Sequence, residues 1–422
     1  MDRRKFIQGA ATASGLLFVK PETAFGYAAN SRVRYGLLGC GRRGTSVATS
    51  FAKNAGVEIV ALADIFPDQL AKGKQHFDAV NASLGLPAID SKRTFVGHDA
   101  SKAIAACADV DAIQISTPPF FHVEHLDTVT SAGKHAYCEK PVGVDIPQTR
   151  HALEIAGRAN GKVSMAVGFQ IRSAPPFVEL VRRLHEGQIG KIAQIAAFYN
   201  APPAVTVDKP GASADELRLR NWLWYRNLSG DILLEQNIHV IDVCNWVMQG
   251  HPIAAYAKSS RKVVKNAGDT SDNYEVIFTY PGDVQLSFSS TQFNKNNFFD
   301  VSERFFGTEG LAEAPYSGAL RILGNQPWEW NSGAPAATGQ FAANGAFTDN
   351  LAEADAMKDR SFIESITSGK FQNQIAAGVE SARSCMMARK SAQTGRTVTW
   401  AEIEADNEAY SLGMNLAQFG RV

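Results

Sequence analysis

The sequence has little cysteine and no excess of either charge. Its 422 residues include 5 Cys with no CxxC pair and no His spacing of the zinc kind, which argues against a disulfide framework and a zinc site. Lys plus Arg and Asp plus Glu both number 42, so the total charge attracts neither nucleic acid nor an anionic membrane. After the N-terminal region no apolar run approaches the ~20 residues that cross a bilayer. A content of 45% hydrophobic and 20% charged residues predicts a globular chain of two domains with a small, neutral partner.

The N-terminus has the layout of a secretory signal. Residues 1–26 begin with basic side chains, continue as a weakly apolar stretch and end in small residues. The pair Arg3 and Arg4, followed by a third basic residue and then apolar ones, resembles a bacterial twin-arginine signal. We therefore expect residues 1–30 to be a signal and linker, and the mature protein to be periplasmic or otherwise exported.

The rest of the chain changes its hydrophobic rhythm once. Short apolar runs alternate with helical patterns up to about Gly168, which is typical of a doubly wound parallel sheet of the Rossmann kind. After about Gly190, alternating and longer strands indicate a second, α+β domain with a large, mostly antiparallel sheet. We expect the dinucleotide-binding domain at 31–160, a substrate and oligomerisation domain at 161–400, and a C-terminal tail at 401–422. The expected parallel strands are 33–39, 57–64, 111–117, 135–140 and 163–169.

A glycine turn follows the first predicted strand. Residues 39–44 read GCGRRG, a helical pattern comes next, and the second strand ends at Asp64. Strand, glycines, helix, strand and acidic end in this order predict a dinucleotide site, in which backbone approaches the pyrophosphate and Asp64 accepts the ribose hydroxyls. The carboxylate favours NAD over NADP. Arg42 and Arg43 next to the turn leave the choice open, because either could bind the pyrophosphate or the 2′-phosphate of NADP. The predicted cofactor residues here are Gly39, Gly41, Arg42, Arg43, Gly44 and Asp64.

Further motifs resemble those of the Gfo/Idh/MocA family, which is named for glucose-fructose oxidoreductase and inositol dehydrogenase. They are STPP at 116–119, AGKHAYCEKPVG at 132–143, GFQIR at 168–172 and GTEG at 307–310, and the resemblance spans about residues 33–400. It implies that Lys140 lines the nicotinamide pocket and contacts the reacting hydroxyl. It adds five residues to the predicted cofactor set: Thr117, Pro118, His122, Glu139 and Lys140.

The second signature of that family, an Asp and a His four residues later, is similar to Glu235 and His239. The sequence departs from the family pattern because Glu replaces Asp and Asn237 stands where Gly is usual. If 231–248 is one helix, Glu235, His239 and Asp242 project from the same face. His239 suits the removal of a hydroxyl proton, and Lys140 can polarise that hydroxyl. The same three residues could also ligate a metal; we expect no metal, because the resemblance implies a metal-free role.

The predicted catalytic residues are Lys140, His239 and Glu235, and the predicted substrate residues are Gln170, Arg172, Asp242 and Trp222. Gln170 and Arg172 follow a strand end, and Trp222 belongs to an aromatic cluster that is either core or a wall against a sugar ring. For His122 and for His125, packing of the cofactor loop and direct contact with the cofactor are both open.

Together these features predict an exported NAD(P)-dependent oxidoreductase acting on a sugar or cyclitol hydroxyl, with a tightly bound cofactor and a homo-oligomeric assembly. One alternative is a glycoside hydrolase or lyase that works by transient oxidation, elimination and re-reduction. Another is a sugar-binding protein that has no catalytic activity.

Overall fold

The computed structural model describes residues 32–296, 298–331 and 349–420. The predicted signal lies outside these ranges. The described residues from Val33 onward form one compact unit. Within the described residues no helix is long and apolar enough to span a bilayer.

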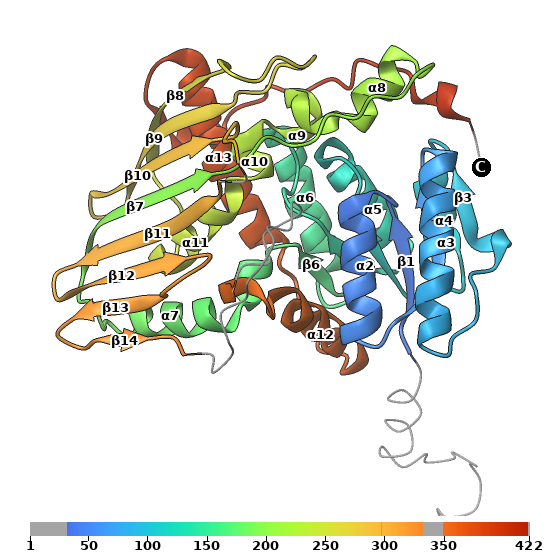
Figure 1. The fold of residues 1–422 in the computed structure, drawn as a ribbon, viewed down its shortest axis with the longest axis horizontal. Coiled ribbons are helices and arrows are strands. Elements are labelled where there is room, and N and C mark those ends of the chain that lie inside the picture. Colours follow the sequence, from blue (N-terminus) through green and yellow to red (C-terminus); the bar gives the residue numbers. More distant parts are fainter. Residues whose placement is uncertain (1–31, 297, 332–348, 421–422) are drawn as a thin grey trace, which may run out of the picture. The chain divides into compact units, whose positions relative to one another are not determined.

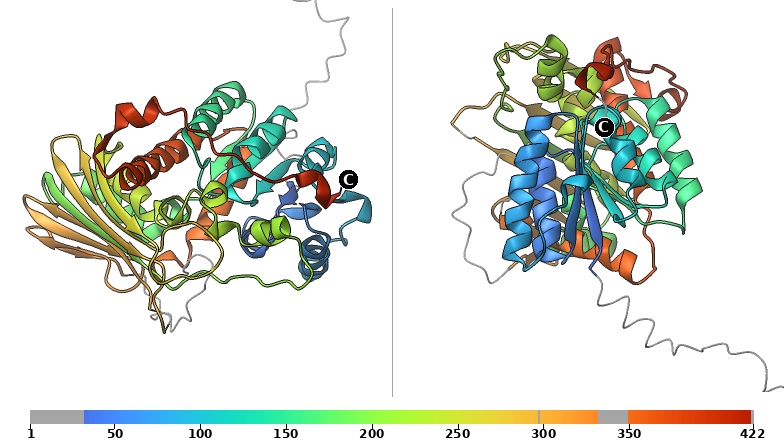
Figure 2. Two further views of the ribbon diagram at one scale, coloured as in Figure 1. Left: turned by 90° about the horizontal axis from the view of Figure 1, so that it is seen from above. Right: turned by 90° about the vertical axis from the view of Figure 1, so that its right-hand side faces the viewer.

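The N-terminal domain is built on a six-stranded parallel sheet in the order β3-β2-β1-β4-β5-β6 (Figure 1). Its strands are continuous apolar runs because helices cover both faces of the sheet, as Figure 2 shows in its right-hand view. The strands are β1 (Arg34–Leu38), β2 (Glu58–Asp64), β3 (Thr94–Val96), β4 (Ala112–Ile115), β5 (His135–Cys138) and β6 (Met165–Val167). The helices are α2 (Arg42–Asn54), α3 (Pro67–Ser83), α4 (Ala100–Ala106), α5 (His122–Ser131) and α6 (Ile146–Ala159).

The predicted Rossmann sheet is confirmed, and β6, which falls within the strand expected at 163–169, pairs with β5 at the edge of the sheet. One strand of the sheet was not expected. Strand β3 is a short edge strand of three half-buried residues, too short for a hydrophobic period to mark it in the sequence. The chain order places the carboxyl ends of β1, β2, β4 and β5 along one edge, where open α/β sheets bind ligands.

The C-terminal domain carries a nine-stranded sheet in the order β14-β13-β12-β11-β7-β10-β9-β8-β15. Neighbouring strands are antiparallel except β7 and β10, which confirms the mostly antiparallel prediction. One face of the sheet buries a row that runs through Phe278, Leu286, Ile195 and Phe305 against helices. The strands are β7 (Ile192–Asn200), β8 (Ala254–Ser260), β9 (Asn273–Tyr280), β10 (Val284–Thr291), β11 (Asp300–Gly307), β12 (Gly310–Pro315), β13 (Arg321–Gly324), β14 (Trp328–Glu329) and β15 (Val398–Thr399).

The helices of this domain differ from the prediction in one place that matters. The helix expected over 231–248 is broken into α10 and α11, because the Asn237 N–H donates to the Ile232 carbonyl five residues back and the next turn starts anew. Glu235 therefore ends one helix, and His239 and Asp242 belong to the next. The helices are α7 (Pro175–His185), α8 (Ala214–Arg220), α9 (Arg226–Ser229), α10 (Ile232–Glu235), α11 (Ile238–Met248), α12 (Ala354–Thr367), α13 (Ile375–Thr394) and α14 (Trp400–Glu404).

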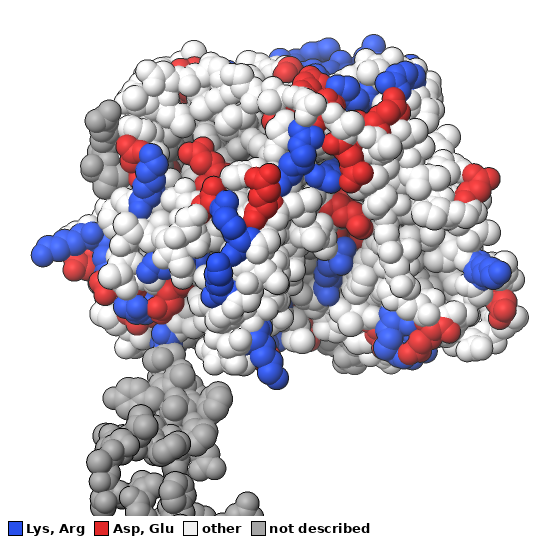
Figure 3. Space-filling view, turned by 180° about the vertical axis from the view of Figure 1, so that it is seen from behind, with Lys and Arg blue, Asp and Glu red and all other residues white. Residues whose placement is uncertain are grey.

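The two domains share chain segments. Helix α12 returns to pack on α2 of the first domain, and α13 packs on both α6 and β8. Residues from α14 onward also cross toward the first domain, so the segment expected to be a tail is part of the packed structure. On the face shown in Figure 3, basic and acidic side chains are interspersed.

Candidate functional site

The glycine turn between β1 and α2 has the shape that a dinucleotide requires. Gly39 has a φ of +98°, and a Cβ there would lie 2.6 Å from the Ser116 carbonyl oxygen. A Cβ on Gly44 would lie 2.0 Å from the Gly39 carbonyl oxygen, so the helix packs directly on the turn. A Cβ on Gly41 would meet nothing within 4 Å. The fold itself thus explains the first and last glycines, whereas the middle one faces open space that a ligand can enter.

Helix α2 begins at this open position without a side-chain cap. Its N-cap is Gly41, which has no side chain to accept a hydrogen bond from the first turn. The amide groups and the positive end of the helix dipole therefore face a ligand phosphate. The residues present fit the pyrophosphate of an adenine dinucleotide.

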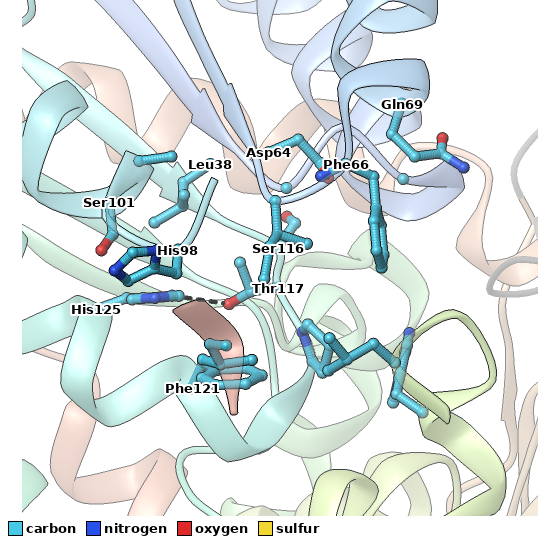
Figure 4. Close-up of a pocket in the computed structure, with 18 of the residues that line it drawn as sticks. Leu38, Asp64, Phe66, Gln69, His98, Ser101, Ser116, Thr117, Phe121 and His125 are labelled. Atoms are coloured by element: carbon cyan, nitrogen blue, oxygen red, sulfur yellow. Dashed lines mark hydrogen bonds between the residues drawn. The ribbon is translucent and has the colours of Figure 1, made fainter. Parts of the chain in front are cut away.

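A cleft opens from the turn along the carboxyl ends of β1, β2 and β4. It has an empty volume of about 950 Å³, part of it open to solvent, and Gly39, Gly41, Asp64, Ser116, Thr117 and Pro118 are among its walls (Figure 4). Thr117 and His125 are joined by a 3.0 Å hydrogen bond at the cleft, so His125 supports the loop that follows β4.

Asp64 is fixed at the end of β2 by its neighbours. The Cys40 N–H donates to Oδ2 (2.7 Å) and the Phe66 N–H donates to Oδ1 (2.8 Å). Burial raises the pKa of Asp64 to about 6, against the opposing effect of these two amides. At neutral pH the group is therefore a carboxylate with lone pairs left for two ribose hydroxyls.

Arg43 points away from this end of the cleft. Its guanidinium donates to Glu139 (3.1 Å), Gln170 (3.3 Å) and Asp355 (3.5 Å). A buried carboxylate pair, Glu139 and Asp355, satisfies its charge in this structure, and its role beside the pyrophosphate or a 2′-phosphate stays a prediction. Arg43 links the glycine turn to the residues after β5 and β6.

Lys140 and Glu235 meet beyond the end of β5. The Lys140 Nζ lies 3.0 Å from Glu235 Oε1 and also donates to the Glu235 backbone carbonyl. Both side chains are largely buried, with 11% and 14% of their surface exposed. The break between α10 and α11 allows this contact, because it leaves the last carbonyl of α10 free for the lysine.

His239 lies in the same neighbourhood with an unpaired nitrogen. Only 7% of the residue is exposed, and its Nδ1 has no hydrogen-bond partner among the described residues. Burial lowers the pKa of His239 well below its usual value, and the positive charges of Lys140 and Arg43 lower it further. The imidazole is therefore neutral at pH 7, which is the form that accepts a proton.

The family follows from comparison with known proteins. Residues 33–167 match the NAD-binding Rossmann fold of the GFO/IDH/MocA oxidoreductases, and residues 177–313 match the C-terminal domain of the same family. The chain belongs to the Gfo/Idh/MocA family. The predicted family, enzyme class and NAD-binding domain are thereby confirmed.

Several relatives of this Gfo/Idh/MocA protein are named for their activities. It is 29% identical over 240 residues to an inositol 2-dehydrogenase of Rhizobium meliloti (strain 1021); the match covers 57% of this chain and 62% of the relative. It is 30% identical over 213 residues to a glycosyl hydrolase family 109 protein of Streptomyces niveus, covering 48% and 39%. The solved aldose-aldose oxidoreductase of Caulobacter crescentus, complexed with glycerol, has a TM-score of 0.65 and 19% identity, over 87% of this chain and 100% of that one. The last match shows a shared fold.

The remaining predicted residues of this family member are distributed around the two halves of the site. Arg172 binds Asp242 through two hydrogen bonds of 2.8 and 2.9 Å, and Ser381 donates to the same carboxylate (2.7 Å). The Arg172 guanidinium thus satisfies Asp242, and the predicted metal alternative has no support in the described residues. Trp222 lines the same cleft as Gly39 and Asp64, and its contact with a sugar ring stays a prediction.

His122 has a positioning role. It is 1% exposed, and its ring nitrogens lie 2.8 Å from the Pro141 and Thr117 carbonyl oxygens. It therefore ties the loop after β4 to the loop after β5, and its direct contact with the cofactor stays a prediction. His122 thus holds in place the two loops that lie next to Lys140.

Two groups of residues escaped the sequence analysis. Asp355 and its partner Lys358 on α12 lie behind Arg43, and Arg220 of α8 lines the cleft. Neither group belongs to a local motif. Their only signal in the sequence is a charged residue within a helical pattern, which is ordinary for a solvated helix.

Proposed function

We propose that this protein is an exported oxidoreductase that oxidises or reduces a CH–OH group of a sugar or cyclitol with a tightly held NAD. The observation that carries the proposal is the meeting of Lys140, Glu235 and a neutral His239 next to a dinucleotide cleft. The inositol 2-dehydrogenase relative supports a polyhydroxylated ring as the substrate class.

The chain's own residues supply the proton chemistry. When bound, NAD accepts or returns hydride. The neutral imidazole of His239 accepts the hydroxyl proton, and the Lys140 ammonium stabilises the negative charge that develops on that oxygen. Glu235 holds the Lys140 ammonium through its side chain and its carbonyl, so the charge is already in place before the substrate arrives.

The cofactor preference follows from charge. A 2′-phosphate would face the Asp64 carboxylate, while Arg43 is bound to Glu139 and Arg220 is bound to Asp68 (2.6 Å). Both of these arginines are paired with carboxylates, and the Asp64 carboxylate favours NAD over NADP.

Export gives the cofactor a special requirement. The twin-arginine pathway carries folded proteins, and free nicotinamide nucleotides are scarce outside the cytoplasm, so a retained NAD would be reduced by one sugar and reoxidised by another. A fold shared with an aldose-aldose oxidoreductase supports this cycle. Mass spectrometry of nucleotide released from purified, extensively dialysed protein tests it. We expect close to one NAD per chain; a protein that binds NAD only at millimolar concentrations would refute tight retention.

A second candidate is a redox-neutral glycoside hydrolase. The match to a glycosyl hydrolase family 109 protein favours it, and Lys140 and His239 suit it equally. Oxidation of one sugar carbon acidifies the neighbouring C–H, the glycosidic group is eliminated, water adds, and the sugar is reduced again. Incubation with aryl glycosides separates the candidates: aglycone release without net change in NADH absorbance supports hydrolysis, while conversion of free sugars alone supports the oxidoreductase.

We also propose a homo-oligomer that assembles through the outer face of the nine-stranded sheet. Tyr256 and Ile277 are paired neighbours on this face and are 41% and 50% exposed, and Phe306 and Leu323 lie in an adjacent row. Exposed apolar rows of this kind mark interfaces. Sedimentation of the protein and of an Ile277→Lys variant tests this surface, since the variant should shift toward the monomer.

A further inference from the structure

The last described residues of the chain reach the far end of the dinucleotide cleft. Residues 405–420, here called the C-terminal segment, leave α14, run beside α8 and end near β3 (Figures 1 and 2). The Tyr410 N–H donates to Asp145 (2.8 Å), Gln418 donates to Asp215 of α8 (2.8 Å), and the His98 ring lies 2.5 Å from the Gly420 carbonyl oxygen. The segment is thus fastened to both domains.

The segment alternates between covered and exposed residues. Leu412, Met414 and Leu416 are partly buried, whereas the residues between them are exposed. The covered side chains pack on a small apolar cluster that contains Phe66 and Phe121. The Phe66 and Phe419 rings meet edge to face with centroids 5.6 Å apart. This alternation of partly buried and exposed residues is typical of an extended segment that lies on a surface, in agreement with these contacts.

The apolar cluster is also a wall of the cleft. Phe66, Phe121, Leu219 and Leu416 line the same cavity as Gly39 and Asp64. In Figure 4 the Phe66 and Phe121 rings lie on either side of the cleft, with Thr117 between them. Arg220 stacks on Phe66, with its guanidinium carbon 3.9 Å from the ring centroid, and so closes the side next to α8.

This wall belongs to the adenosine half of the cleft. Phe66 follows Asp64 by two residues at the end of β2, while Lys140 follows β5, and the sheet order separates β2 from β5 by β1 and β4. An adenine dinucleotide spans this distance with its ribose at Asp64 and its nicotinamide toward Lys140. An apolar, aromatic chamber with few polar groups is the usual surrounding of a flat heterocycle.

We infer that the C-terminal segment is part of the cofactor site, where Leu416 and Phe419 complete an apolar chamber for the adenine ring and slow release of the dinucleotide. The inference rests on the proposed function for the identity of the ligand. Its physical basis is that the segment covers the adenosine end from outside. Departure of a bound nucleotide then requires the segment to detach from α8 and from His98.

The test compares a double variant, Leu416→Ala with Phe419→Ala, with a matched control, Val178→Ala with Ile253→Ala. The control removes apolar side chains that are 43% and 46% exposed and lie outside the cleft. NADH is loaded on each protein, its dissociation rate is followed by nicotinamide fluorescence after addition of excess NAD, and the affinity for ADP-ribose is measured separately. ADP-ribose probes the adenosine half alone.

We expect the double variant to release NADH about tenfold faster, equivalent to about 1.4 kcal/mol, and to bind ADP-ribose more weakly by a similar factor. The control should stay within twofold of the wild type. Thermal unfolding of the nucleotide-free proteins checks that both variants fold, and Phe419→Leu, which keeps an apolar side chain, should retain most of the slow release.

The outcomes separate this inference from the proposed function. A double variant that releases NADH and binds ADP-ribose like the wild type overturns the role of the segment, whether or not sugars are oxidised. Weaker ADP-ribose binding in a protein that oxidises no sugar supports the segment and contradicts the proposed activity. A wild-type protein that binds neither nucleotide overturns both.

Discussion

Replacing Gly41 by Ala should separate dinucleotide binding from folding. A Cβ at this position meets no heavy atom within 4 Å, and the residue has a φ of −68°, which alanine adopts without strain. As an N-cap, Ala costs roughly 0.5–1 kcal/mol relative to Gly, and the stiffer unfolded chain offsets about 0.4–1 kcal/mol. The fold should therefore keep its stability, with a change in Tm below about 2 °C.

The same methyl group occupies the space that a pyrophosphate must enter. If it prevents two amide hydrogen bonds to phosphate, at about 1.5–3 kcal/mol each, the loss is about 3–6 kcal/mol and the Kd for NADH rises about 100-fold or more. Isothermal titration with NADH measures the Kd, and differential scanning calorimetry of the nucleotide-free protein measures the Tm.

Two neighbouring glycines provide the matched controls. Ala at Gly39 or Gly44 would place its Cβ 2.6 or 2.0 Å from a backbone oxygen, so these variants should lose stability as well as binding. Loss of binding at all three positions with loss of stability at only two is the expected pattern. A Gly41→Ala protein with wild-type NADH affinity would refute the assignment of the open space to the dinucleotide.

Three further predictions concern the charges of the site. Lys140→Met should lower kcat about 100-fold or more, because the variant cannot stabilise the developing alkoxide. His239→Asn should lower kcat by a similar factor; in the wild type, the acid limb of kcat/KM should fall below pH 6.5, because burial and the charges of Lys140 and Arg43 keep the pKa of His239 low. Burial raises the pKa of Asp64 to about 6, so NADH affinity is fully present above that pH and should fall by up to about tenfold per unit below it.

Each of these has a control that separates chemistry from folding. For Lys140→Met, NADH titration must show that the cleft still binds, and a loss of kcat below threefold would contradict the role of the ammonium. For His239, an acid limb centred at pH 6.5 or above in the wild type, and absent from the Asn variant, would contradict the buried neutral imidazole. For Asp64, the Asp64→Asn variant removes the titrating group, and a wild type whose affinity is flat between pH 7 and 5 would argue against a ribose contact.

The replacement of Asp by Glu in the second family signature has a structural counterpart. Glu235 is the last residue of α10, and its carbonyl and carboxylate both hold Lys140. The helix break at Gln236 and Asn237 frees that carbonyl. The side chain and the backbone carbonyl of Glu235 thus both bind the Lys140 ammonium. The prediction of a single helix did not anticipate this double contact.

The sequence alone determined the Rossmann domain, the glycine turn, Asp64 and the position of Lys140. These features are local: a strand, a tight turn and a helix that follow one another are fixed by backbone geometry and hydrophobic period within about 30 residues. Tertiary structure decided the direction of Arg43, its pairing with Asp355, the satisfied state of Arg172 and the passage of Leu416 over the cleft. These features depend on which segments from distant parts of the chain pack together. Local periodicity does not carry that information, because the contacts of a charged or apolar side chain are set only when the chain has folded.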